Sequence, residues 1–388
     1  MLAVVPITSL KVWLVLLLAV ILLTPLTHAR LRRAALALVN LLFVWLCVGE
    51  YLPALLIGVA LLWGLLRLRR GRGAALLGGL VISGGVGALF VLHKLPTLSA
   101  RAGLSQLNPL LSGIGFSYVC LRVIDVWRSV HSGLHPPPGL LELINYLLPF
   151  HMLAAGPILS YDDYLKQPAV PPAPDTETVL EALERIAAGL FKKFVLAYLL
   201  LEMFSTGWRA TGWYRWVEIN LHFLWVYLDF SAYSDIAVGF GRLLGLTTPE
   251  NFNRPYLARN LTEFWERWHI TLSQFIRRHL FVPLHMAFLR RSDGRHALLG
   301  ASLALLVSFL LCGAWHGLTG AFLAWGLLHA AGLVAGNLYK EWLRRRLSPA
   351  ALARYQAAPL IRALAVFATY QFVAFSLWLV GNHWRANW

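Results

Sequence analysis

The amino-acid sequence predicts an all-α, polytopic membrane protein with about ten or eleven transmembrane helices and further interfacial or re-entrant helices. Of its 388 residues, 58% are hydrophobic and 13% are charged, and the mean hydropathy is +0.63. Water-soluble globular domains do not have this composition. Apolar stretches long enough to cross about 30 Å of hydrocarbon recur from one end of the chain to the other.

The expected spans follow one another along the whole chain, as a single membrane domain of residues 1–388. They lie near residues 9–27, 34–49, 51–66, 74–93, 107–127, 139–159, 180–204, 213–245, 297–314, 317–338 and 360–381. The first span is long and lacks a convincing small-residue cleavage site. We therefore expect a transmembrane helix there and not a signal peptide.

Basic residues predict the orientation of the chain in the membrane. Two clusters lie early in the sequence, at Arg30, Arg32 and Arg33 and at Arg67, Arg69, Arg70 and Arg72. The turn between them carries Glu50 and Pro53. By the positive-inside rule, both clusters face the cytoplasm and the N-terminus lies outside. Most of the net charge of +16 thus has a topological explanation, and no nucleic-acid partner is expected without a soluble domain that carries a basic face.

The cysteines give no sign of a metal or disulfide site. Cys47, Cys120 and Cys312 lie singly in apolar segments, and their spacing matches neither pattern. We expect small buried side chains there and no bound metal.

Two stretches, expected to be cytoplasmic loops near residues 160–178 and 246–296, interrupt the hydrophobic pattern. Prolines are dense in the first, which predicts a surface loop without helix. In the second, Asn260 is a plausible N-cap with Glu263 three positions on. The residues that follow at helical spacing on one apolar face are Phe264, Trp265, Trp268, Leu272 and Ile276. We expect an amphipathic helix that lies in the membrane interface.

His316 is the first candidate for chemistry, because it lies inside an apolar run of residues 298–338. An ionisable group at membrane depth is costly unless it lines a cavity or has a partner. The following Gly317 permits close approach of a backbone or a substrate. His269 follows Trp268 at the edge of the expected aromatic face. It is either a packing residue or a second histidine of the same site.

Residues 227–235 place two carboxylates in an otherwise apolar span. Asp229 and Tyr233 share one face of a helix, and Asp235 lies on another. One interpretation is structural, with Asp235 paired to a basic residue such as Arg242 and Asp229 hydrogen-bonded to a neighbouring helix. The other interpretation is direct participation in chemistry.

Two other functions could use these residues. His316 and His329 are thirteen positions apart, a spacing that could place two haem ligands on one helix face, but a second such pair is missing. Asp229, Asp235 and His316 could instead form the proton relay of a transporter. Against transport, polar residues are concentrated after residue 225, whereas transporters usually show two related halves.

The polar blocks of the second half resemble those of the membrane-bound O-acyltransferase family. The four blocks are residues 229–235, 251–256, 263–269 and 315–317. They occur in the order and at the spacing found in the family. Weaker similarity at residues 115–118, 156–158 and 372–379 extends the resemblance over most of residues 110–388. It implies that residues 107–388 form a catalytic core preceded by N-terminal helices in residues 1–106.

Two bacterial branches of the family remain open. The alginate O-acetyltransferase branch is similar over residues 229–269, but its members tend to carry a Gly-Gly-Asn-Arg element after the amphipathic helix. This chain instead has Pro-Leu-His-Met at residues 283–286. There it is similar to the D-alanyl transferase branch that modifies teichoic acids. The acyl group is therefore D-alanyl or acetyl.

The resemblance implies that His316 is the general base and that His269 is the second catalytic histidine. The binding or supporting residues that it implies are Asp229, Tyr233, Asp235, Asn251, Asn253, Arg254, Trp265, Arg267, Trp268 and Trp315. An imidazole, with an ordinary pKa of about 6.5, can take the proton of a hydroxyl that attacks a thioester carbonyl.

The resemblance also implies the partners and the location of the reaction. The donor is an acyl thioester, on an acyl carrier protein or on coenzyme A as acetyl-CoA, at the cytoplasmic side, and no tightly bound cofactor is expected. The acceptor is a polysaccharide or polyol of the cell envelope, where an accessory acyltransferase is a further expected partner. The expected location is the bacterial cytoplasmic (inner) membrane. A cationic surface at Arg277, Arg278, Arg290, Arg291 and Arg295 either docks an acidic carrier or anchors to lipid.

Overall fold

The structure, a computed structural model, describes residues 9–68, 72–95, 101, 115–205 and 212–385. Apart from one isolated bridge, the regular structure of these residues is helical, which confirms the all-α prediction. The chain divides into two units, which we describe separately. The first unit is Met1–Gly189 with Tyr233–Pro249, and the second is Leu190–Ala232 with Glu250–Trp388.

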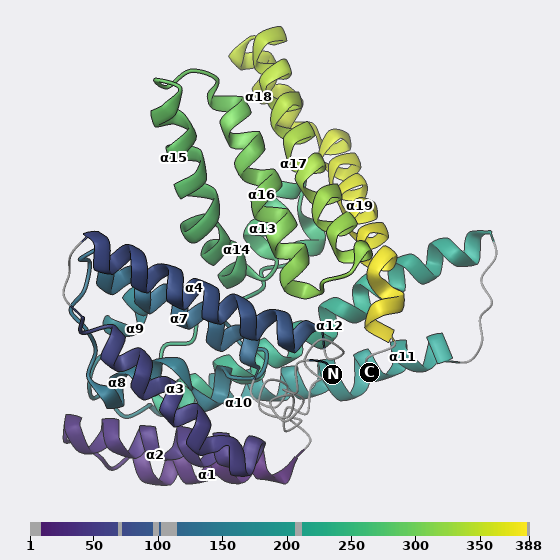
Figure 1. Cartoon of the computed structure of the whole chain (residues 1–388). Helices are drawn as coiled ribbons and strands as arrows, with labels where there is room; N and C mark the ends of the chain where they lie inside the picture. Colours follow the sequence, from purple (N-terminus) through teal and green to yellow (C-terminus); the bar gives the residue numbers. More distant parts are fainter. Residues whose placement is uncertain (1–8, 69–71, 96–100, 102–114, 206–211, 386–388) are drawn as a thin grey trace. The chain divides into compact units, whose positions relative to one another are not determined.

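The first unit consists of helices joined mostly by short turns (Figure 1). They are α1 (Leu10–Leu23), α2 (Ala29–Val48), η1 (Gly49–Tyr51), α3 (Leu52–Leu65), α4 (Arg72–Lys94), α7 (Phe116–His131), α8 (Leu140–Leu147), η3 (Phe150–Met152), α9 (Tyr161–Leu165), most of α10 (Thr176–Phe191) and the end of α12 (Trp213–Leu244). The helices α1 and α2 pack side by side and are drawn in purple in Figure 1. Gly49 ends α2 with a φ of +53°, a conformation that glycine adopts without strain.

The helix expected at residues 139–159 is interrupted after Leu147, and a buried arginine lies at the interruption. That prediction was wrong: α8 ends before Pro149, whose ring fits poorly inside a helix. Arg122, fully buried in α7, donates from its Nη atoms to the carbonyl oxygens of Leu147 and Met152 at 3.3 and 3.2 Å. The backbone groups freed by the break therefore find partners inside the protein, as they must away from water.

The proline-rich segment is only partly a loop. Residues 166–175 are non-helical, as predicted, but α9 precedes them as a short helix that the sequence analysis did not expect. Ser160 caps α9 by accepting the N–H of Asp163 at 3.1 Å. Local capping is thus enough to form one helical turn before the prolines begin.

The second unit contains the remaining helices. They are η4 (Lys192–Ala197), α11 (Tyr198–Ser205), most of α12 (Trp213–Leu244), η5 (Pro255–Leu257), α13 (Leu261–Arg267), α14 (Ile270–Ile276), η6 (Arg277–Phe281), α15 (Val282–Arg291), α16 (Ala297–His316), α17 (Gly320–Arg346), α18 (Pro349–Ala357) and α19 (Pro359–Arg385). Asn260 caps α13 by accepting the N–H of Glu263 at 3.0 Å, as predicted. The continuous helix expected from Asn260 to Ile276 was wrong, because the chain breaks at residues 268–269.

The helices α16 and α17 pack closely because each presents a glycine to the backbone of the other. A Cβ at Gly313 would lie 2.3 Å from the carbonyl oxygen of Phe322, and a Cβ at Gly326 would lie 2.3 Å from that of Phe309. Small residues permit this approach between membrane helices. The packing places the end of α16 beside the beginning of α17.

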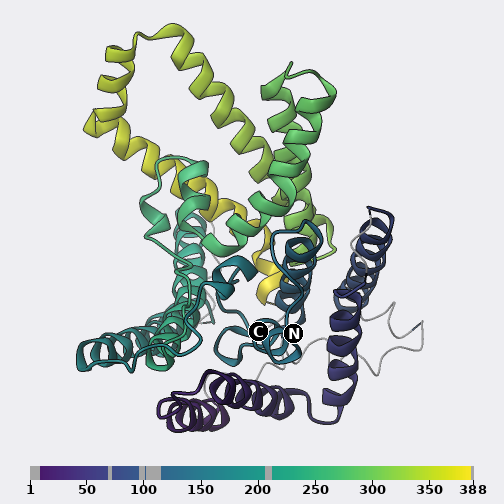
Figure 2. The ribbon, with the colours of Figure 1, turned by 90° about the vertical axis from the view of Figure 1, so that its left-hand side faces the viewer.

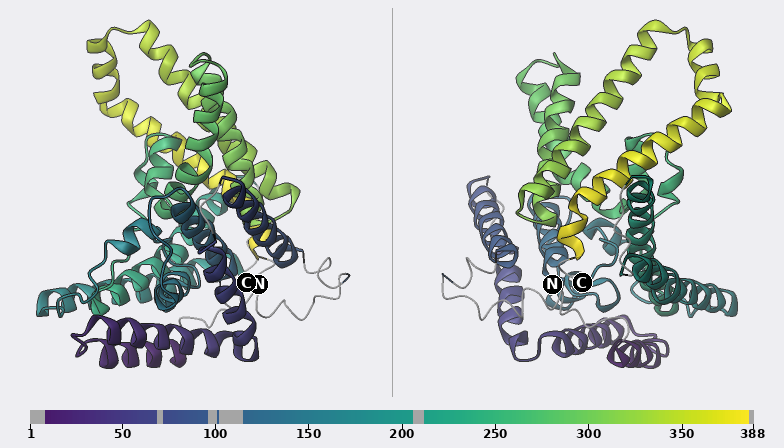
Figure 3. Two further views of the ribbon diagram at one scale, coloured as in Figure 1. Left: turned by 60° about the vertical axis from the view of Figure 1, so that its left-hand side comes forward. Right: turned by 90° about the vertical axis from the view of Figure 1, so that its right-hand side faces the viewer.

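The helices α17 and α19 are joined at their far ends by α18 and converge at their other ends (Figures 2 and 3). There, His329 of α17 lies 2.9 Å from Ser376 of α19, between Nε2 and Oγ. This contact fixes the two helices where the candidate site lies.

Within the described residues, four helical segments are long and apolar enough to cross a membrane. They are Ala29–Leu65, Ala297–His316, Gly320–Arg346 and Pro359–Gly381. The spans expected at residues 180–204 and 213–245 are also helical, but their polar residues lower their hydropathy. Residues 107–114, the start of another expected span, lie outside the described residues. The polytopic membrane class agrees with these helices.

Candidate functional site

His269 lies at the break between α13 and α14, where residues 251–253 pair with the backbone on both sides of it. Two backbone hydrogen bonds, of 2.9 and 3.0 Å, join residues 251–253 to residues 267–270, and an isolated antiparallel bridge forms there. His269 has a φ of +42°, a conformation that costs a non-glycine residue about 1–3 kcal/mol. The strand-like pairing offsets this cost and sets the direction of the imidazole.

Asn251 determines which nitrogen of His269 carries the proton. Its side chain is fully buried, and its Oδ1 accepts hydrogen bonds from the N–H and the hydroxyl of Thr271, at 3.3 and 2.9 Å. A backbone N–H can only donate, so the atom that faces it is the amide oxygen. The same oxygen lies 3.1 Å from Nδ1 of His269. That nitrogen must therefore donate, which leaves Nε2 as the acceptor of the neutral ring.

Burial keeps His269 neutral. Desolvation lowers the pKa of His269 to about 3, and the nearby His316 lowers it further by repulsion between charges. This electrostatic effect indicates that the two histidines predicted from the sequence lie in the same region of the second unit. The ring of Phe230 contacts His269 edge-on, with centroids 4.8 Å apart.

His316 is the last residue of α16 and is partly exposed. Its ring contacts three aromatic rings at centroid distances of 4.8 Å (Trp315), 5.4 Å (Trp325) and 6.0 Å (Phe322). A Cβ on the following Gly317 would lie 2.5 Å from the ring of Phe322. Only glycine fits there, so the close approach expected from the sequence occurs within the protein itself.

His329 is a third histidine of this region, and the sequence pattern did not predict a catalytic role for it. The hydroxyl of Ser376 donates to the carbonyl oxygen of Val373 at 2.8 Å, so it accepts from Nε2 of His329. The ring of His329 is buried and contacts Trp325 at 4.6 Å. The thirteen-residue spacing to His316 had suggested only haem ligation on one helix. The two residues lie on different helices, so that argument fails.

Aromatic residues form the wall around the histidines. Trp268 contacts Phe252 at 5.1 Å and stacks on Phe264 at 5.5 Å. Trp265 lies nearer the third histidine, 5.3 Å from the ring of His329. Trp265 and Trp268, two of the three tryptophans predicted for the site, thus contact different histidine-bearing parts of this unit.

Arg267 has a supporting contact within this unit. Its Nη2 lies 2.5 Å from Oε1 of Glu263, whose other oxygen accepts from the backbone and side chain of Arg259 at 2.9 and 3.0 Å. The carboxylate therefore connects the start and the end of α13. This pairing stabilises the helix that precedes His269.

The two aspartates of α12 form ion pairs. Asp229 pairs with Lys193 in the second unit. Asp235 belongs to the first unit, where it accepts from Nε of Arg185 at 2.6 Å. Arg242, the partner named from the sequence, instead pairs with Glu181 at 3.0 Å. The structure therefore supports structural roles for both carboxylates.

The remaining predicted residues have other surroundings. Tyr233 belongs to the first unit and packs against Met152 and Leu159. Asn253 and Arg254 have exposed side chains, although the backbone of Asn253 takes part in the pairing with α13. In the part of the chain that the structure describes, no group of three or more His, Cys, Asp or Glu residues could hold a metal ion.

Comparisons with known proteins agree on one family. The model of the membrane-bound O-acyltransferase family matches residues 37–380. The teichoic acid D-alanyltransferase of Bacillus subtilis is 25% identical over 301 residues, which are 75% of this chain and 74% of that protein. The probable alginate O-acetylase AlgI of Pseudomonas aeruginosa is 32% identical over 238 residues, 58% of this chain and 43% of that protein. The peptidoglycan O-acetyltransferase of Helicobacter pylori is 32% identical over 224 residues, 55% of this chain and 41% of that protein.

Proposed function

Because this chain belongs to the membrane-bound O-acyltransferase family, we propose that it transfers a D-alanyl or acetyl group to hydroxyls of an extracytoplasmic cell-envelope polymer. Its class, a membrane O-acyltransferase, follows from the family. The names of the relatives specify three acceptors, which are teichoic acid, alginate and peptidoglycan. All three are polymers of the cell envelope or surface, which supports the same class of acceptor for this chain.

The observation that carries the proposal is the pair His269 and His316 in one aromatic-lined region. Asn251 and burial hold His269 neutral, with its acceptor on Nε2. His316 is more exposed and ends its helix beside a glycine. A buried neutral imidazole suits orientation of a reactant, whereas a more accessible one suits proton transfer.

In the proposed reaction, His316 accepts the proton of the acceptor hydroxyl while the oxygen of that hydroxyl attacks the thioester carbonyl. The new carbon–oxygen bond forms, the carbon–sulfur bond breaks, and the imidazolium returns the proton to the departing thiolate. General base catalysis of this kind contributes about 10²- to 10⁴-fold to the rate. His269 orients a reactant through Nε2.

Replacement of His316 tests this function. In His316→Ala, ester-linked acyl groups on isolated envelope polymers should fall at least about 100-fold, because the base is lost. The amount of protein in the membrane should not change. The matched control is His28→Ala, which removes an exposed imidazole that makes no capping bond at the start of α2. Full modification by the His316 variant would refute the assignment.

The donor belongs to the proposal as well. We infer an acyl thioester on a carrier protein or on coenzyme A, delivered from the cytoplasmic side of a bacterial inner membrane, with an accessory acyltransferase outside. The cationic surface expected to receive a carrier divides into two exposed groups. Arg277 and Arg278 begin the helix formed by η6 and α15, and Arg290 and Arg291 end it, about 20 Å further along the axis. Arg295 lies just beyond the second group.

The transporter alternative loses its main support. Asp229 and Asp235, two members of the imagined proton relay, each have a basic partner. The chain also belongs to a family of acyltransferases and not to a family of transporters.

A further inference from the structure

An open groove lies in the second unit, between η5 and the first three turns of α19. It has a volume of about 570 Å³. The lining residues used below are Tyr256, Arg259, Arg362, Val366, Phe367 and Tyr370. None of them is a histidine or belongs to the proposed catalytic pair.

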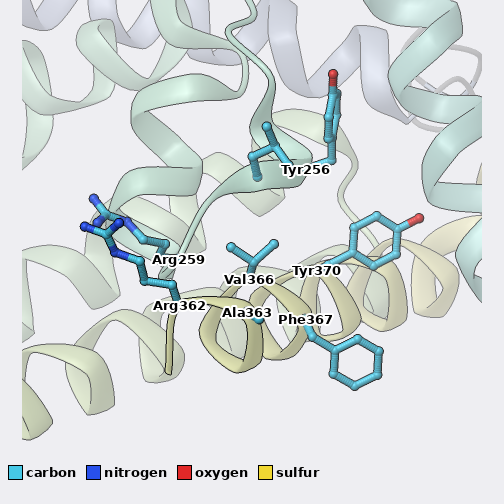
Figure 4. A pocket seen from close by; sticks show the side chains of 8 residues that line it. Tyr256, Arg259, Arg362, Ala363, Val366, Phe367 and Tyr370 are labelled. Atoms are coloured by element: carbon cyan, nitrogen blue, oxygen red, sulfur yellow. The ribbon is translucent and has the colours of Figure 1, made fainter. Parts of the chain in front are cut away.

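One end of the groove is cationic. Figure 4 shows the guanidinium groups of Arg259 and Arg362 at the same end, away from Tyr370. Arg259 uses Nε to bind Glu263, and Arg362 uses Nε to bind the carbonyl oxygen of Gln356 at 3.1 Å. Among the described residues, the Nη atoms of both arginines make no hydrogen bond. They can therefore receive an anionic oxygen from outside the protein.

Among the described residues, the ion pairs at this end leave an excess of positive charge. Glu263 is the carboxylate in contact, and it is shared between Arg259 and Arg267. With Arg362, three positive charges thus face one negative charge. A phosphate has enough anionic oxygens to accept from two guanidinium groups at once.

The rest of the groove is apolar and follows a helix that can span the membrane. Val366 and Phe367 lie one to two turns beyond Arg362 on the candidate span Pro359–Gly381. Phe367 is 55% exposed. From Arg362 to Tyr370 the helix rises about 12 Å. The groove therefore runs from a cationic end, near the start of a spanning helix, into its apolar part.

We propose that this groove binds one anionic phospholipid of the surrounding bilayer. Its phosphate lies between Arg259 and Arg362, and one acyl chain lies along Val366 and Phe367. The alignment of charge and apolar surface along a membrane helix favours an amphiphile, because a free anion would leave the apolar part of the groove unfilled.

The bound lipid supports the wall behind His269. Tyr256 contacts Tyr227 at 5.4 Å, and Tyr370 contacts Phe223 at 4.8 Å. The rings of Tyr227 and Phe223 in turn contact the ring of Trp268, with centroids 6.4 and 5.9 Å away, respectively. A lipid in the groove thus restrains the aromatic rings that pack on Trp268, the residue directly before His269. Removal of the lipid should lower the thermal stability of this unit.

The test uses the full-length protein, purified in a neutral detergent and stripped of lipid. Lipid binding is measured by native mass spectrometry, and the unfolding temperature is measured in parallel. The probes are phosphatidylglycerol, phosphatidylcholine with the same acyl chains, and inorganic phosphate. We expect tight binding and a raised unfolding temperature for phosphatidylglycerol only. Equal binding of phosphatidylcholine, or an equal effect of phosphate alone, would overturn the proposal.

Variants locate the site. Arg362→Gln should weaken the binding of phosphatidylglycerol at least about tenfold, a change that corresponds to about 1.4 kcal/mol. Val366→Trp should do the same by filling the apolar part, without a change of charge. Arg354→Gln, on α18 and outside the groove, is the matched control and should bind normally. Undiminished binding by both groove variants would show that the lipid binds elsewhere. Activity is not needed for any of these readouts, so they are independent of the proposed reaction.

Discussion

His269 combines a strained backbone with a neutral ring, and Asn251 contributes to both. The backbone of Asn251 holds the break in the chain, and its side chain holds the proton on Nδ1. One buried amide thus sets the position and the tautomer of the second histidine. A similar arrangement, with Ser376 as acceptor, orients His329.

Replacement of the amide by a carboxylate should change the pH dependence of the enzyme. In Asn251→Asp, a negative charge beside Nδ1 stabilises the imidazolium and raises the pKa of His269 from about 3 toward its ordinary value. Acyl transfer should then fall at mildly acidic pH, where the unchanged enzyme is still active. The measurement is the pH profile of transfer, with Asn253→Asp, an exposed amide in the same segment, as the control. Identical profiles for the two variants would contradict a required neutral His269.

The buried imidazole also predicts how stability depends on pH. The pKa of His269 is about 3 in the folded protein and about 6.5 in an unfolded chain. Between these values only the unfolded state binds the proton, so stability falls as the pH decreases below about 6.5. The contribution of one such group is at most about 1.4 kcal/mol per pH unit.

His269→Gln isolates this contribution, because glutamine keeps a polar side chain but does not titrate. The unfolding temperature of the variant should decrease less than that of the unchanged protein between about pH 7 and pH 5. Parallel decreases in both proteins would show that His269 is not the group responsible.

At the scale of helices, close glycine contacts position the chemistry. The pairing of α16 with α17 depends on Gly313 and Gly326. It brings His316 and His329 against the same ring, that of Trp325. The break between α13 and α14 places His269 at a turn, where a regular helix would have directed it elsewhere. The positions of these histidines therefore depend on helix ends and close helix contacts more than on the long regular helices.

Gly313→Ala should disturb this packing. Its Cβ would lie 2.3 Å from the carbonyl oxygen of Phe322, so the helices must separate, at a cost of about 1–3 kcal/mol. We expect a lower unfolding temperature and reduced transfer. Gly336→Ala on α17 is the control, because its Cβ meets nothing within 4 Å. Equal stability of the two variants would mean that the contact is not a constraint on the site.

At the scale of the whole molecule, the distribution of charge predicts the orientation in the membrane. With the three native cysteines replaced, Glu50→Cys should react with an impermeant thiol reagent applied to intact cells, and Arg72→Cys should not. Labelling after the cells are opened provides the control for accessibility of both positions. The reverse pattern would place the thioester donor on the wrong side of the membrane.

The cationic groups of the second unit give a test of carrier recognition. Carrier proteins are typically acidic, so capture of an acyl carrier by the purified enzyme should weaken steeply with salt. A variant with Arg290→Glu and Arg291→Glu should lose this capture. A second variant, with Arg277→Glu and Arg278→Glu at the other end of the same helix, provides the comparison with an equal change of charge. Undiminished capture by the first variant would leave only anchoring to lipid head groups.

The amino-acid sequence was sufficient to predict the fold class of the protein and to single out the histidines that we propose for its site. Composition and apolar length require a helical membrane protein, because lipid offers no partner for open backbone groups. His316 stands out for the same reason, as an ionisable group in an apolar run. The capping of α13 by Asn260 was also predictable, since the residues involved are neighbours in the chain.

How these parts meet depends on contacts between residues that are far apart in the chain. The break at His269 depends on Asn251, eighteen positions away, and the break after α8 is satisfied by Arg122, twenty-five or more positions away. Arg185 is fifty positions from its partner Asp235. Helical periodicity averages over one or two turns, so it records which face is apolar but not which distant group replaces a lost hydrogen bond. Such partners are chosen by the packing of whole helices, and that packing decides where the chain bends and which histidines share a site.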